Sequence, residues 1–364
     1  MSNNTDLKKT AAFTGGGTGG HIYPGLAVAA ALKGACGIVW IGSSGKIDRA
    51  IVGAAGIKFE QISGGKLRRY FSFQNFIDVF KIIAGFFASL FILKRYKPAL
   101  LFSKGGFVSV PPVAAAFVLG IPVFTHESDF SPGLATKINS LFAKKIFVSY
   151  EETAAFFSKR LSGKIIVSGN PVRQSFYSAN PEKGRAFLNI PAGEKILLVL
   201  GGSLGAAELN NLVENCIKEL TKNFFVVHQT GGGCKSQLQA ARYIRLPYIN
   251  DEMPDILASA TLVMGRAGAG TVWECAAAGR PMLLIPLSGA ATRGDQVENA
   301  RFFTEKGAAL TLIHPDGAEL LNALDSLLDS PEKLSGMAAA AARIGERRGT
   351  SIIAERITAQ IQGN

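Results

Sequence analysis

Cysteine is scarce in this sequence, and the residue types that bind metals are not gathered into sites. Only four cysteines occur among 364 residues, and they show no C-x-x-C pair and no zinc-like spacing. This usage is typical of reduced thiols in the cytosol. The chain also lacks a D-x-D pair of carboxylates and a cluster of histidine and cysteine at ligand spacing. We therefore expect no bound metal and no cofactor.

Long apolar runs are absent as well. The most apolar run, Ile82–Leu93, has twelve residues and lies between Lys81 and Lys94. A helix that crosses a bilayer needs about 20 apolar residues. The first residues, MSNNTDLKKT, are polar and lack the apolar core of a secretory signal. We therefore expect no transmembrane segment, although the apolar run still fits a helix that lies on a membrane.

Acidic residues are outnumbered by basic ones. The chain has 27 Asp and Glu against 39 Lys and Arg, which gives a net charge of +12. Such an excess favours an anionic partner, either a nucleic acid, a phosphorylated substrate or an acidic membrane surface. Because no nucleic-acid reader motif is present and no expected sheet carries basic residues interleaved with aromatic ones, we expect no nucleic acid. The length and the apolar content of 48% fit two globular α/β domains.

Short apolar runs alternate with longer segments of helical period through both halves of the sequence. The first half shows this from KKTAAFTGG to EETAAFF, and the second from KILLVLGGS to DQVENARFFTEKG. The alternation predicts parallel sheets with helices on both faces. A Gly-Asn-Pro turn in VSGNPVRQSF marks a boundary. We expect an α/β fold of two doubly wound Rossmann-like domains facing across a cleft: residues 1–170, residues 171–340, and a helix in 341–364 that packs back on the first domain.

Glycine is abundant where the first strand passes into a helix, in FTGGGTGGHIYPGLAVAAAL. Such a loop exposes backbone N–H groups at a helix start, where the helix dipole favours an anion. The residues Gly15, Gly17 and Gly20 also satisfy the G-x-G-x-x-G pattern of dinucleotide-binding folds. That pattern requires an acidic residue at the end of the second strand, and none occurs there before Asp48. A phosphate or sugar ligand is therefore favoured over NAD.

Two further glycine loops and one histidine extend this interpretation. His21 lies at the first helix start, where the dipole disfavours the imidazolium and so favours a neutral base; capping or packing is the alternative. Ser203 follows a strand in LLVLGGSLGAAELN, and Arg266, Thr271 and Glu274 lie in MGRAGAGTVWECAAAG. Glu274 fits a ribose diol as well as a helix cap. The three loops together predict a site for a nucleotide diphosphate.

Seven motifs in order resemble the MurG-type glycosyltransferases of peptidoglycan synthesis, which belong to the GT-B superfamily. The motifs are GGGTGGHIYPGLA, SKGGFVSVP, HESDFSPGL, GNPVR, GGSLGA, RAGAGTVWE and GDQVENA. The resemblance covers nearly the whole chain. It implies inverting, metal-independent transfer of N-acetylglucosamine from UDP-GlcNAc to the C4 hydroxyl of the muramyl sugar of lipid I (undecaprenyl-pyrophosphoryl-muramyl-pentapeptide), which gives lipid II. A glycolipid transferase with another acceptor, a UDP-GlcNAc epimerase and a non-catalytic nucleotide-binding paralogue are the alternatives.

The resemblance also implies a role for each motif residue. It places the donor in the C-terminal domain, at Arg173, Ser203, Ile249 (whose backbone would read uracil), Arg266, Ala269, Gly270, Thr271, Glu274, Asp295 and Gln296. It places the acceptor in the N-terminal domain, at Thr18, Gly19, Gly20 and Asp129. His21 is the expected general base, and Glu127 is either an alternative base or the group that orients the imidazole.

Two residues depart from the family pattern. Asp129 stands in HESD where the family usually reads HEQN, and Asp295 stands before Gln296 where another amide is common. An ionised carboxylate accepts hydrogen bonds but donates none. The fit of the acceptor and the choice of donor sugar are therefore open.

Basic clusters and aromatic residues alternate over residues 66–97. A basic amphipathic segment of this kind is typical of proteins that dock on anionic lipid; a helix buried against its own sheet is the alternative. The expected membrane patch consists of Lys66, Arg68, Arg69, Phe76, Phe80, Phe86, Phe87, Lys94 and Arg95. We expect a peripheral protein on the cytoplasmic face of the plasma membrane, bound to an anionic membrane surface.

Overall fold

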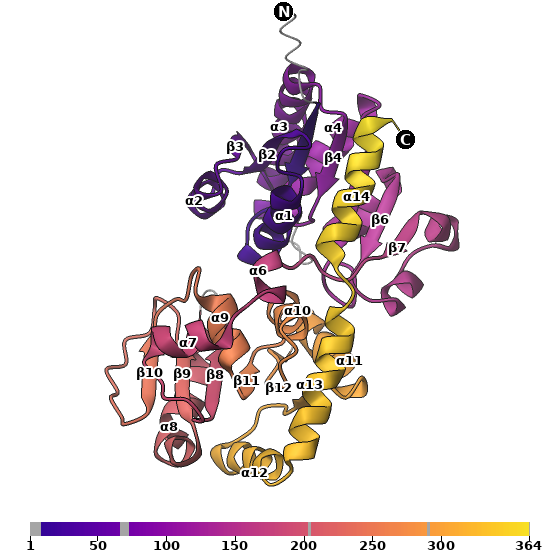
Figure 1. The fold of residues 1–364 in the computed structure, drawn as a ribbon. Helices are drawn as coiled ribbons and strands as arrows, with labels where there is room; N and C mark the ends of the chain where they lie inside the picture. Colours follow the sequence, from indigo (N-terminus) through magenta and orange to yellow (C-terminus); the bar gives the residue numbers. More distant parts are fainter. Residues whose placement is uncertain (1–8, 66–72, 203–204, 290–291, 364) are drawn as a thin grey trace, which may run out of the picture. The chain divides into compact units, whose positions relative to one another are not determined.

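The chain folds into two compact units. The structure is a computed structural model that describes residues 9–65, 73–202, 205–289 and 292–363 (Figure 1). The first unit consists of residues 1–171 and 348–364, and the second of residues 172–347. The second boundary thus follows Arg347, whereas the sequence indicated residue 340. The reason is that helix α13 (Pro331–Gly345) continues through residue 340 within the second unit.

The first unit is built on a seven-stranded sheet in which all neighbouring strands are parallel. The strand order is β3-β2-β1-β4-β5-β6-β7. The strands are β1 (Thr10–Thr14), β2 (Gly37–Ser43), β3 (Lys58–Ile62), β4 (Leu100–Ser103), β5 (Val123–Glu127), β6 (Lys145–Val148) and β7 (Ile165–Val167). Strands β4 and β5 are fully buried, and β1 is buried except at Thr10, as expected of parallel strands with helices on both faces.

Helices cover both faces of this sheet. They are α1 (Gly19–Ala31), α2 (Lys46–Ala54), α3 (Phe73–Tyr96), α4 (Val110–Val118), α5 (Leu134–Phe142) and α14 (Gly349–Gln362), with short 3-10 turns at Phe107–Ser109, Glu152–Phe156 and Lys159–Lys164. Helices α1 and α14 pack together over one core. Ile353 and Ile357 of α14 belong to the same buried cluster as the aromatic side chains of Phe13 and Phe102. Helices α3, α4 and α5 cover the other face, around Val108.

The second unit repeats the plan with a six-stranded parallel sheet. Its order is β10-β9-β8-β11-β12-β13. The strands are β8 (Ile196–Leu200), β9 (Phe225–Gln229), β10 (Tyr243–Leu246), β11 (Leu262–Gly265), β12 (Met282–Leu284) and β13 (Ala309–Thr311). The other helices are α6 (Gln174–Tyr177), α7 (Pro181–Leu188), α8 (Ala207–Asn223), α9 (Met253–Ser259), α10 (Ala269–Ala277), α11 (Asp295–Glu305) and α12 (Gly317–Leu328).

Both sheets therefore begin at a central strand, add two strands on one side and then cross to the other side. This is the strand order of the doubly wound fold, and it confirms the expected class of two Rossmann-like α/β domains. In such sheets the carboxyl ends of the strands lie at one edge, where ligands bind. The loops that follow β1, β4 and β5 in the first unit, and β8, β11 and β12 in the second, are therefore the places to look for a site.

Candidate functional site

The glycine loop after β1 is held by an acidic side chain of its own unit. Asp48, on α2, is buried. Its carboxylate accepts the Gly17 N–H, 3.1 Å from each oxygen, and the Ser43 hydroxyl at 2.6 Å. Gly17 has a φ of +85°, and a Cβ at Gly16 would lie 2.2 Å from Asp48 Oδ2. The early part of the loop is thus fixed by the protein's own carboxylate, a contact that the sequence did not reveal.

The later part of the glycine loop leads into the N-terminus of helix α1. Thr18 is the N-cap residue with an extended backbone, and within the described residues its side chain makes no capping hydrogen bond. Thr18 and Gly20 are exposed, and the first turn, Gly19–Ile22, contains no acidic residue. The N–H groups of such a helix start attract an anion. Thr18, Gly19 and Gly20, all expected at the acceptor, therefore lie at one accessible helix start.

The imidazole of His21 lies against the glycines that follow β4. A Cβ at Gly106 would lie 3.1 Å from His21 Cδ2 and 2.7 Å from the Gly16 carbonyl oxygen. A Cβ at Gly105 would lie 3.7 Å from His21 Nδ1. Both residues have positive φ, +87° at Gly105 and +79° at Gly106, which favours glycine. The two glycines of the SKGG motif therefore leave the space against which the His21 ring packs.

The Glu127 carboxylate is bound to the backbone of the loop that follows it. Oε1 accepts the N–H groups of Ser128 and Asp129 at 2.9 and 3.1 Å, and Oε2 accepts the N–H of Gly133 at 3.0 Å. Glu127 is buried. A buried carboxylate with three backbone donors stabilises the conformation of residues 128–133, at the start of α5.

A buried lysine lies beside this loop. Lys104 is 1% exposed, and its Nζ donates to Ser128 Oγ at 2.6 Å, while the Ser128 hydroxyl donates to Asn170 Oδ1 at 2.6 Å. Burial lowers the pKa of Lys104 to about 8, and the charges of Glu127 and Asp129 raise it against burial. The sequence analysis used the SKGG motif for its glycines and missed this lysine, because nothing in the local sequence distinguishes it from a surface lysine.

In the second unit, helix α10 begins at the carboxyl end of β11 without a side-chain cap. Its N-cap is Gly268, and Ala269, Gly270 and Thr271 form a first turn with no acidic residue. Glu274 lies about one turn further along α10. Burial raises the pKa of Glu274 to about 7, and the positive charge of Arg173 lowers it. Two expected donor residues, Arg173 and Glu274, therefore lie within electrostatic range of each other.

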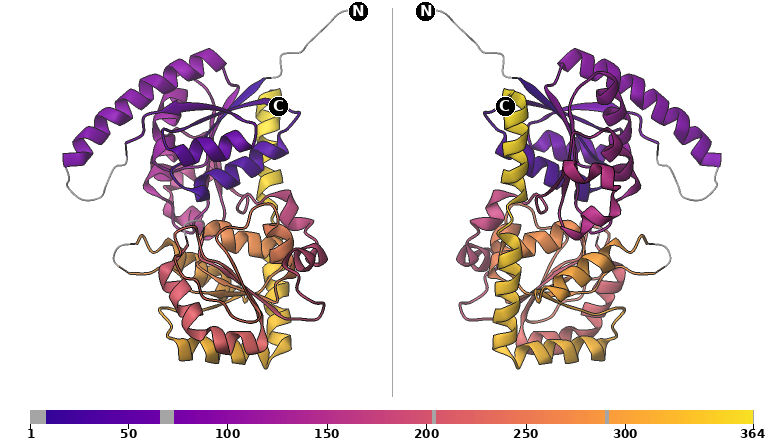
Figure 2. Two further views of the ribbon diagram at one scale, coloured as in Figure 1. Left: turned by 90° about the vertical axis from the view of Figure 1, so that its left-hand side faces the viewer. Right: turned by 90° about the vertical axis from the view of Figure 1, so that its right-hand side faces the viewer.

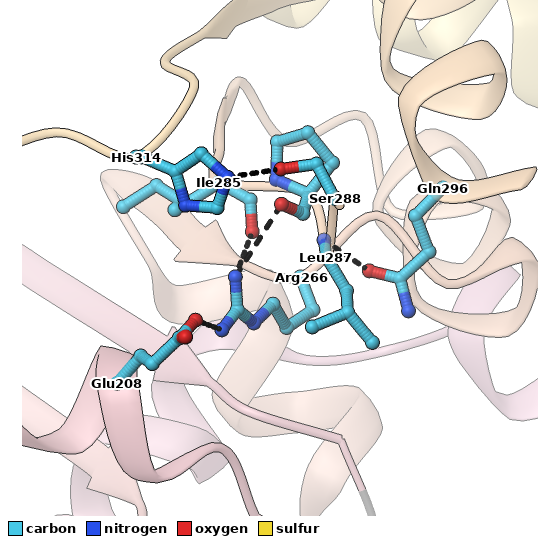
Figure 3. Close-up of polar contacts among 8 residues, drawn as sticks. Glu208, Arg266, Ile285, Leu287, Ser288, Gln296 and His314 are labelled. Carbon is cyan, nitrogen blue, oxygen red and sulfur yellow. Dashed lines mark hydrogen bonds and ion pairs between the residues drawn. The ribbon is translucent and has the colours of Figure 1, made fainter. Parts of the chain in front are cut away.

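Arg266, which follows β11, is held by three partners (Figure 3). Nη1 donates to the carbonyl oxygens of Ile285 and Pro286 at 3.1 and 3.4 Å, and Nη2 donates to Glu208 Oε2 at 2.7 Å. The Arg266 side chain is 11% exposed, whereas that of Glu208, in the first turn of α8, is 71% exposed. The hydrogen bond and charge of Arg266 lower the pKa of Glu208. Glu208 was not identified from the sequence.

Asp295 and Gln296 of the seventh motif lie in the first turn of α11. Gln296 Oε1 accepts the Leu287 N–H at 2.9 Å, also drawn in Figure 3. The carboxylate of Asp295 pairs with Arg293 at 3.4 Å. The departure from the family pattern at Asp295 is thus accompanied by a neighbouring cation in this chain.

The Ile249 backbone is engaged by a glutamine that the sequence analysis did not single out. The Ile249 N–H donates to Gln229 Oε1 at 3.0 Å, and Gln229 Nε2 donates to the Gly202 carbonyl oxygen at 3.4 Å. Gln229 thereby joins the loop after β10 to the glycine loop after β8. Ser203 lies outside the described residues.

Helix α3 lies on the outer side of the first unit (Figure 2), and an exposed apolar stripe runs along it. The stripe consists of Phe80, Ile83, Phe87 and Phe91. Their spacing of three or four residues places them on one face of the helix. Lys94 and Arg95, both exposed, follow in the last turn. The alternative of a helix wholly buried against its own sheet is therefore wrong for this face.

One residue of the expected membrane patch is less exposed than the others that the structure describes. Phe86 is only partly exposed and packs against the core beneath α3, because it is turned about 100° around the helix from Phe87. The residues Lys66, Arg68 and Arg69 and the side chain of Phe76 lie outside the described part of the chain. Among the described residues, no helix has the length and hydropathy to cross a membrane, and no group of three or more His, Cys, Asp or Glu could hold a metal ion.

Two family descriptions match this chain. The Glycosyltransferase family 28 N-terminal domain matches residues 11–148, and the Glycosyltransferase family 28 C-terminal domain matches residues 196–353. The chain belongs to glycosyltransferase family 28. The matched ranges contain the glycine loop and His21 in the first unit, and the α10 start with Glu274 in the second.

Curated relatives of this family-28 chain are named UDP-N-acetylglucosamine–N-acetylmuramyl-(pentapeptide) pyrophosphoryl-undecaprenol N-acetylglucosamine transferase. One from Treponema denticola is 52% identical over 377 residues, covering 95% of this chain and 96% of the relative. One from Clostridium kluyveri is 41% identical over 326 residues, covering 88% and 90%. These relatives confirm the resemblance to MurG-type transferases.

Solved structures give the same picture of the fold. The MurG of Acinetobacter baumannii aligns with a TM-score of 0.73 at 27% identity, covering 96% of this chain and 99% of that structure. A UDP-GlcNAc 2-epimerase from Neisseria meningitidis, bound to UDP-GlcNAc, aligns with a TM-score of 0.69 at 15% identity, covering 98% and 100%. The likeness to the epimerase extends to the fold alone.

Proposed function

We propose that this family-28 protein transfers N-acetylglucosamine from UDP-GlcNAc to the C4 hydroxyl of the muramyl sugar of lipid I, giving lipid II for peptidoglycan synthesis. The observation that carries the proposal is the uncapped start of α10, with Glu274 on the same helix under the positive charge of Arg173, in a chain that aligns over nearly its whole length with transferases of this name. A divergent acceptor and a non-catalytic role are disfavoured by the same alignment.

The second unit takes the donor. The first turn of α10, Ala269–Thr271, offers N–H groups to the diphosphate of UDP, where negative charge grows as UDP leaves. Glu274 accepts hydrogen bonds from the ribose hydroxyls, and Arg173 neutralises the charges near it. Arg266 meets the diphosphate by exchanging Glu208 for a phosphate oxygen. This exchange is favoured because a doubly charged diphosphate attracts a guanidinium more strongly than a single carboxylate does.

Further donor contacts come from the neighbouring loops. Ser203 donates its hydroxyl to a phosphate oxygen, and the Ile249 carbonyl accepts from uracil. Gln296 contacts the N-acetylglucosamine hydroxyls through its amide nitrogen, because its oxygen is bound to Leu287. Asp295, paired with Arg293, lies next to this contact and influences the choice of sugar.

The first unit takes the acceptor. The start of α1, at Thr18, Gly19 and Gly20, binds the acceptor's diphosphate. The C4 hydroxyl oxygen forms a bond to the anomeric carbon of the donor while the bond from that carbon to the β-phosphate oxygen breaks. His21 takes the hydroxyl proton as general base, and UDP leaves with the bonding electrons. Attack from the face opposite to UDP inverts the anomeric centre. Glu127 acts through the loop that it holds, not as the base.

The apolar stripe of α3 places the protein on a membrane that carries the acceptor. Phe117 and Val118 at the end of α4, the helix packed beside α3, add exposed apolar surface, and Lys94 and Arg95 add positive charge for anionic headgroups. We expect the protein to act at the cytoplasmic face of the plasma membrane. Flotation with anionic vesicles at low salt tests this: Phe87→Ser/Phe91→Ser should bind several-fold less than the wild type. Phe187→Ser, an exposed phenylalanine of the second unit, should bind normally.

The activity is tested by incubating the protein with radiolabelled UDP-GlcNAc and a lipid I analogue. The expected result is label in the lipid fraction, with UDP formed in equal amount. Parallel reactions with UDP-glucose and UDP-GalNAc measure the strictness of the donor site. Release of UDP without acceptor, or conversion of the sugar at C2, would instead identify a hydrolase or an epimerase.

A further inference from the structure

The glycine loop after β8 and the loop after β10 are separated in the second unit by the strand between them. The order of the sheet places β9 between β8 and β10, so these loops leave the sheet on either side of β9. The last residue of β9 is Gln229, whose side chain is buried at 4% exposure. A buried amide must find hydrogen-bond partners for both its oxygen and its nitrogen.

The Gln229 amide finds one partner in each of these loops. Its oxygen accepts the Ile249 N–H at 3.0 Å, and its nitrogen donates to the Gly202 carbonyl oxygen at 3.4 Å. Because a backbone N–H only donates and a carbonyl only accepts, the two contacts fix which end of the amide faces which loop. One side chain thereby sets the separation of Ile249, which we expect at the uracil, from the glycine loop, which we expect at the diphosphate.

A chain of hydrogen bonds through the preceding residue, His228, holds the end of β9. Burial lowers the pKa of His228 to about 4, so that its imidazole is neutral. Asn210 Nδ2, on α8, donates to the Thr230 carbonyl oxygen at 2.9 Å. Asn210 Oδ1 therefore accepts from His228 Nε2 at 3.1 Å, which leaves His228 Nδ1 to accept from the Tyr243 hydroxyl at 3.0 Å. The direction of each bond in this chain is thus determined.

The residues that follow Gln229 contact the loops on both sides. A Cβ at Gly205, in the glycine loop, would lie 2.3 Å from the Thr230 carbonyl oxygen, and Gly205 has a φ of +78°, which favours glycine. On the other side, the N–H groups of Thr230 and Gly231 donate to the carbonyl oxygens of Leu246 and Pro247, each at 3.0 Å. The end of β9 is therefore the common support of the two loops that Gln229 joins.

We propose that Gln229 is a positioning residue for the donor nucleotide: it holds the loop of Ile249 and the glycine loop at the separation that one UDP molecule requires, and His228 holds the strand end from which it does so. Gln229 acts through the backbone of both loops and not through the reacting atoms. Because the loops are held in advance, UDP does not have to order them when it binds. The inference rests on the proposed function, which assigns the uracil and the diphosphate to these loops.

Two substitutions separate the two hydrogen bonds of Gln229. Gln229→Met has a similar length and lacks both the donor and the acceptor of the amide. Gln229→Glu retains an oxygen that accepts the Ile249 N–H, but an ionised carboxylate has no hydrogen to donate to the Gly202 carbonyl. If the bridge between the loops is what matters, both variants should bind UDP more weakly, although only Gln229→Met frees the Ile249 N–H.

Kinetics and calorimetry distinguish positioning from a general loss of stability. In both Gln229 variants, the KM for UDP-GlcNAc and the dissociation constant of UDP should rise about tenfold, the size of one lost buried hydrogen bond, whereas the KM for a lipid I analogue should stay within about twofold. The preference for UDP over CDP, given by the ratio of their dissociation constants, should fall about fivefold, because discrimination between bases depends on accurately placed hydrogen-bonding groups.

Two further variants complete the comparison. His228→Phe keeps a ring but breaks the chain to Asn210, so it should raise the KM for UDP-GlcNAc by less than Gln229→Met does, because the amide bridge remains. Ser259→Ala is the matched control: it removes a buried hydroxyl of the same unit, which donates to the Ile256 carbonyl oxygen at 2.7 Å. This variant should have the constants of the wild type.

A second measurement does not depend on turnover. Hydrogen exchange of the Ile249 amide, followed by nuclear magnetic resonance, should be about tenfold faster in Gln229→Met, because the N–H loses its acceptor. In Gln229→Glu and Ser259→Ala this amide should stay protected. Slow exchange in Gln229→Met would show that the bond to Gln229 does not hold the loop.

The proposal is overturned if Gln229→Glu binds UDP as tightly as the wild type, if the KM of both substrates rises equally, or if the preference for UDP over CDP does not change. An unchanged KM in His228→Phe would remove His228 from it. If the wild type transfers no sugar, the proposed function fails, and UDP binding together with exchange at Ile249 still decides whether Gln229 positions the two loops.

Discussion

In the first unit, three charged side chains at the carboxyl edge of the sheet are buried and bound to the protein's own backbone and hydroxyls, whereas in the second unit two ion pairs at the same edge lie nearer the surface. Asp48, Glu127 and Lys104 represent the first kind. The pairs of Arg266 with Glu208 and of Arg293 with Asp295 represent the second. The strand order is the same in both units, so the topology does not determine this difference.

The difference has a physical reason. A buried charge must keep its partner, because separating the two leaves an uncompensated charge in a medium of low polarity. An exposed ion pair contributes little to stability, typically about 0–1 kcal/mol, and exchanges its partner readily. In the proposed reaction, the first unit thus holds the base and its loops in one geometry. The second exchanges internal contacts for those of the leaving diphosphate.

The largest expected effect is the loss of the base that the first unit positions. His21→Ala should reduce kcat by about 10²–10⁴-fold, the usual contribution of a general base, and should leave the KM for UDP-GlcNAc nearly unchanged. Steady-state kinetics with a lipid I analogue measure both constants. His21→Gln separates the loss of the base from the loss of the ring volume. Turnover near the wild-type rate in both variants would assign the base elsewhere.

The next effect concerns the buried carboxylate that fixes the glycine loop. In Asp48→Asn, an amide nitrogen faces the donors of Gly17 and Ser43, so that the first unit should lose about 2–3 kcal/mol of stability. Urea unfolding followed by the fluorescence of Trp40, in a Trp273→Phe background, reports on the first unit alone. Glu151→Gln is the control for charge. An unchanged midpoint would mean that the loop does not depend on its internal carboxylate.

A moderate effect is expected from pH on the donor site. Because the pKa of Glu274 is raised to about 7, its carboxyl gains a proton as the pH falls through 7 and loses the charge that strengthens its hydrogen bonds to the ribose. The KM for UDP-GlcNAc should therefore rise about tenfold between pH 8 and 6. Glu274→Gln should have a high KM that does not vary over this range. A wild-type KM independent of pH would contradict this role.

The smallest expected effect tests whether Arg266, in the second unit, exchanges Glu208 for the diphosphate of UDP. Glu208→Gln weakens the partner that holds Arg266, so that the dissociation constant of UDP should fall about two- to fivefold. Isothermal titration calorimetry measures this constant. Glu219→Gln, on the same helix and paired with Lys222, should have no effect. Weaker UDP binding in Glu208→Gln would show that the acid assists the donor instead of competing with it.

The sequence was sufficient for the fold and for most of the loops of the site. The alternation of strands and helices requires parallel sheets, and glycine at a strand-to-helix turn requires a close backbone approach; both are local signals. Lys104 and Asp48 were missed because their partners lie far away in sequence. The pairs of Arg266 with Glu208 and of Ile249 with Gln229 were missed for the same reason. Such contacts depend on register and packing, which no short motif contains.

The choice of exposed phenylalanines on α3 differs from the structure for another reason. Phe86 was placed in the membrane patch and Phe91 was omitted, because aromatic residues were counted without regard to the period of the helix. The interval of four residues between Phe87 and Phe91 places them on one face, while Phe86 is turned about 100° away from Phe87 and is partly buried. Helical phase, which the sequence contains, would have separated them.

The return of α14 to the first unit has a consequence for biosynthesis. Domains usually fold in the order in which the ribosome makes them. Here the second unit is complete once residue 347 has been made, whereas the first still lacks the apolar side chains of Ile353, Ile357 and Ile361 over its core. The half that is translated first should therefore reach its final state last. Until then, its uncovered core is a surface for chaperones to protect.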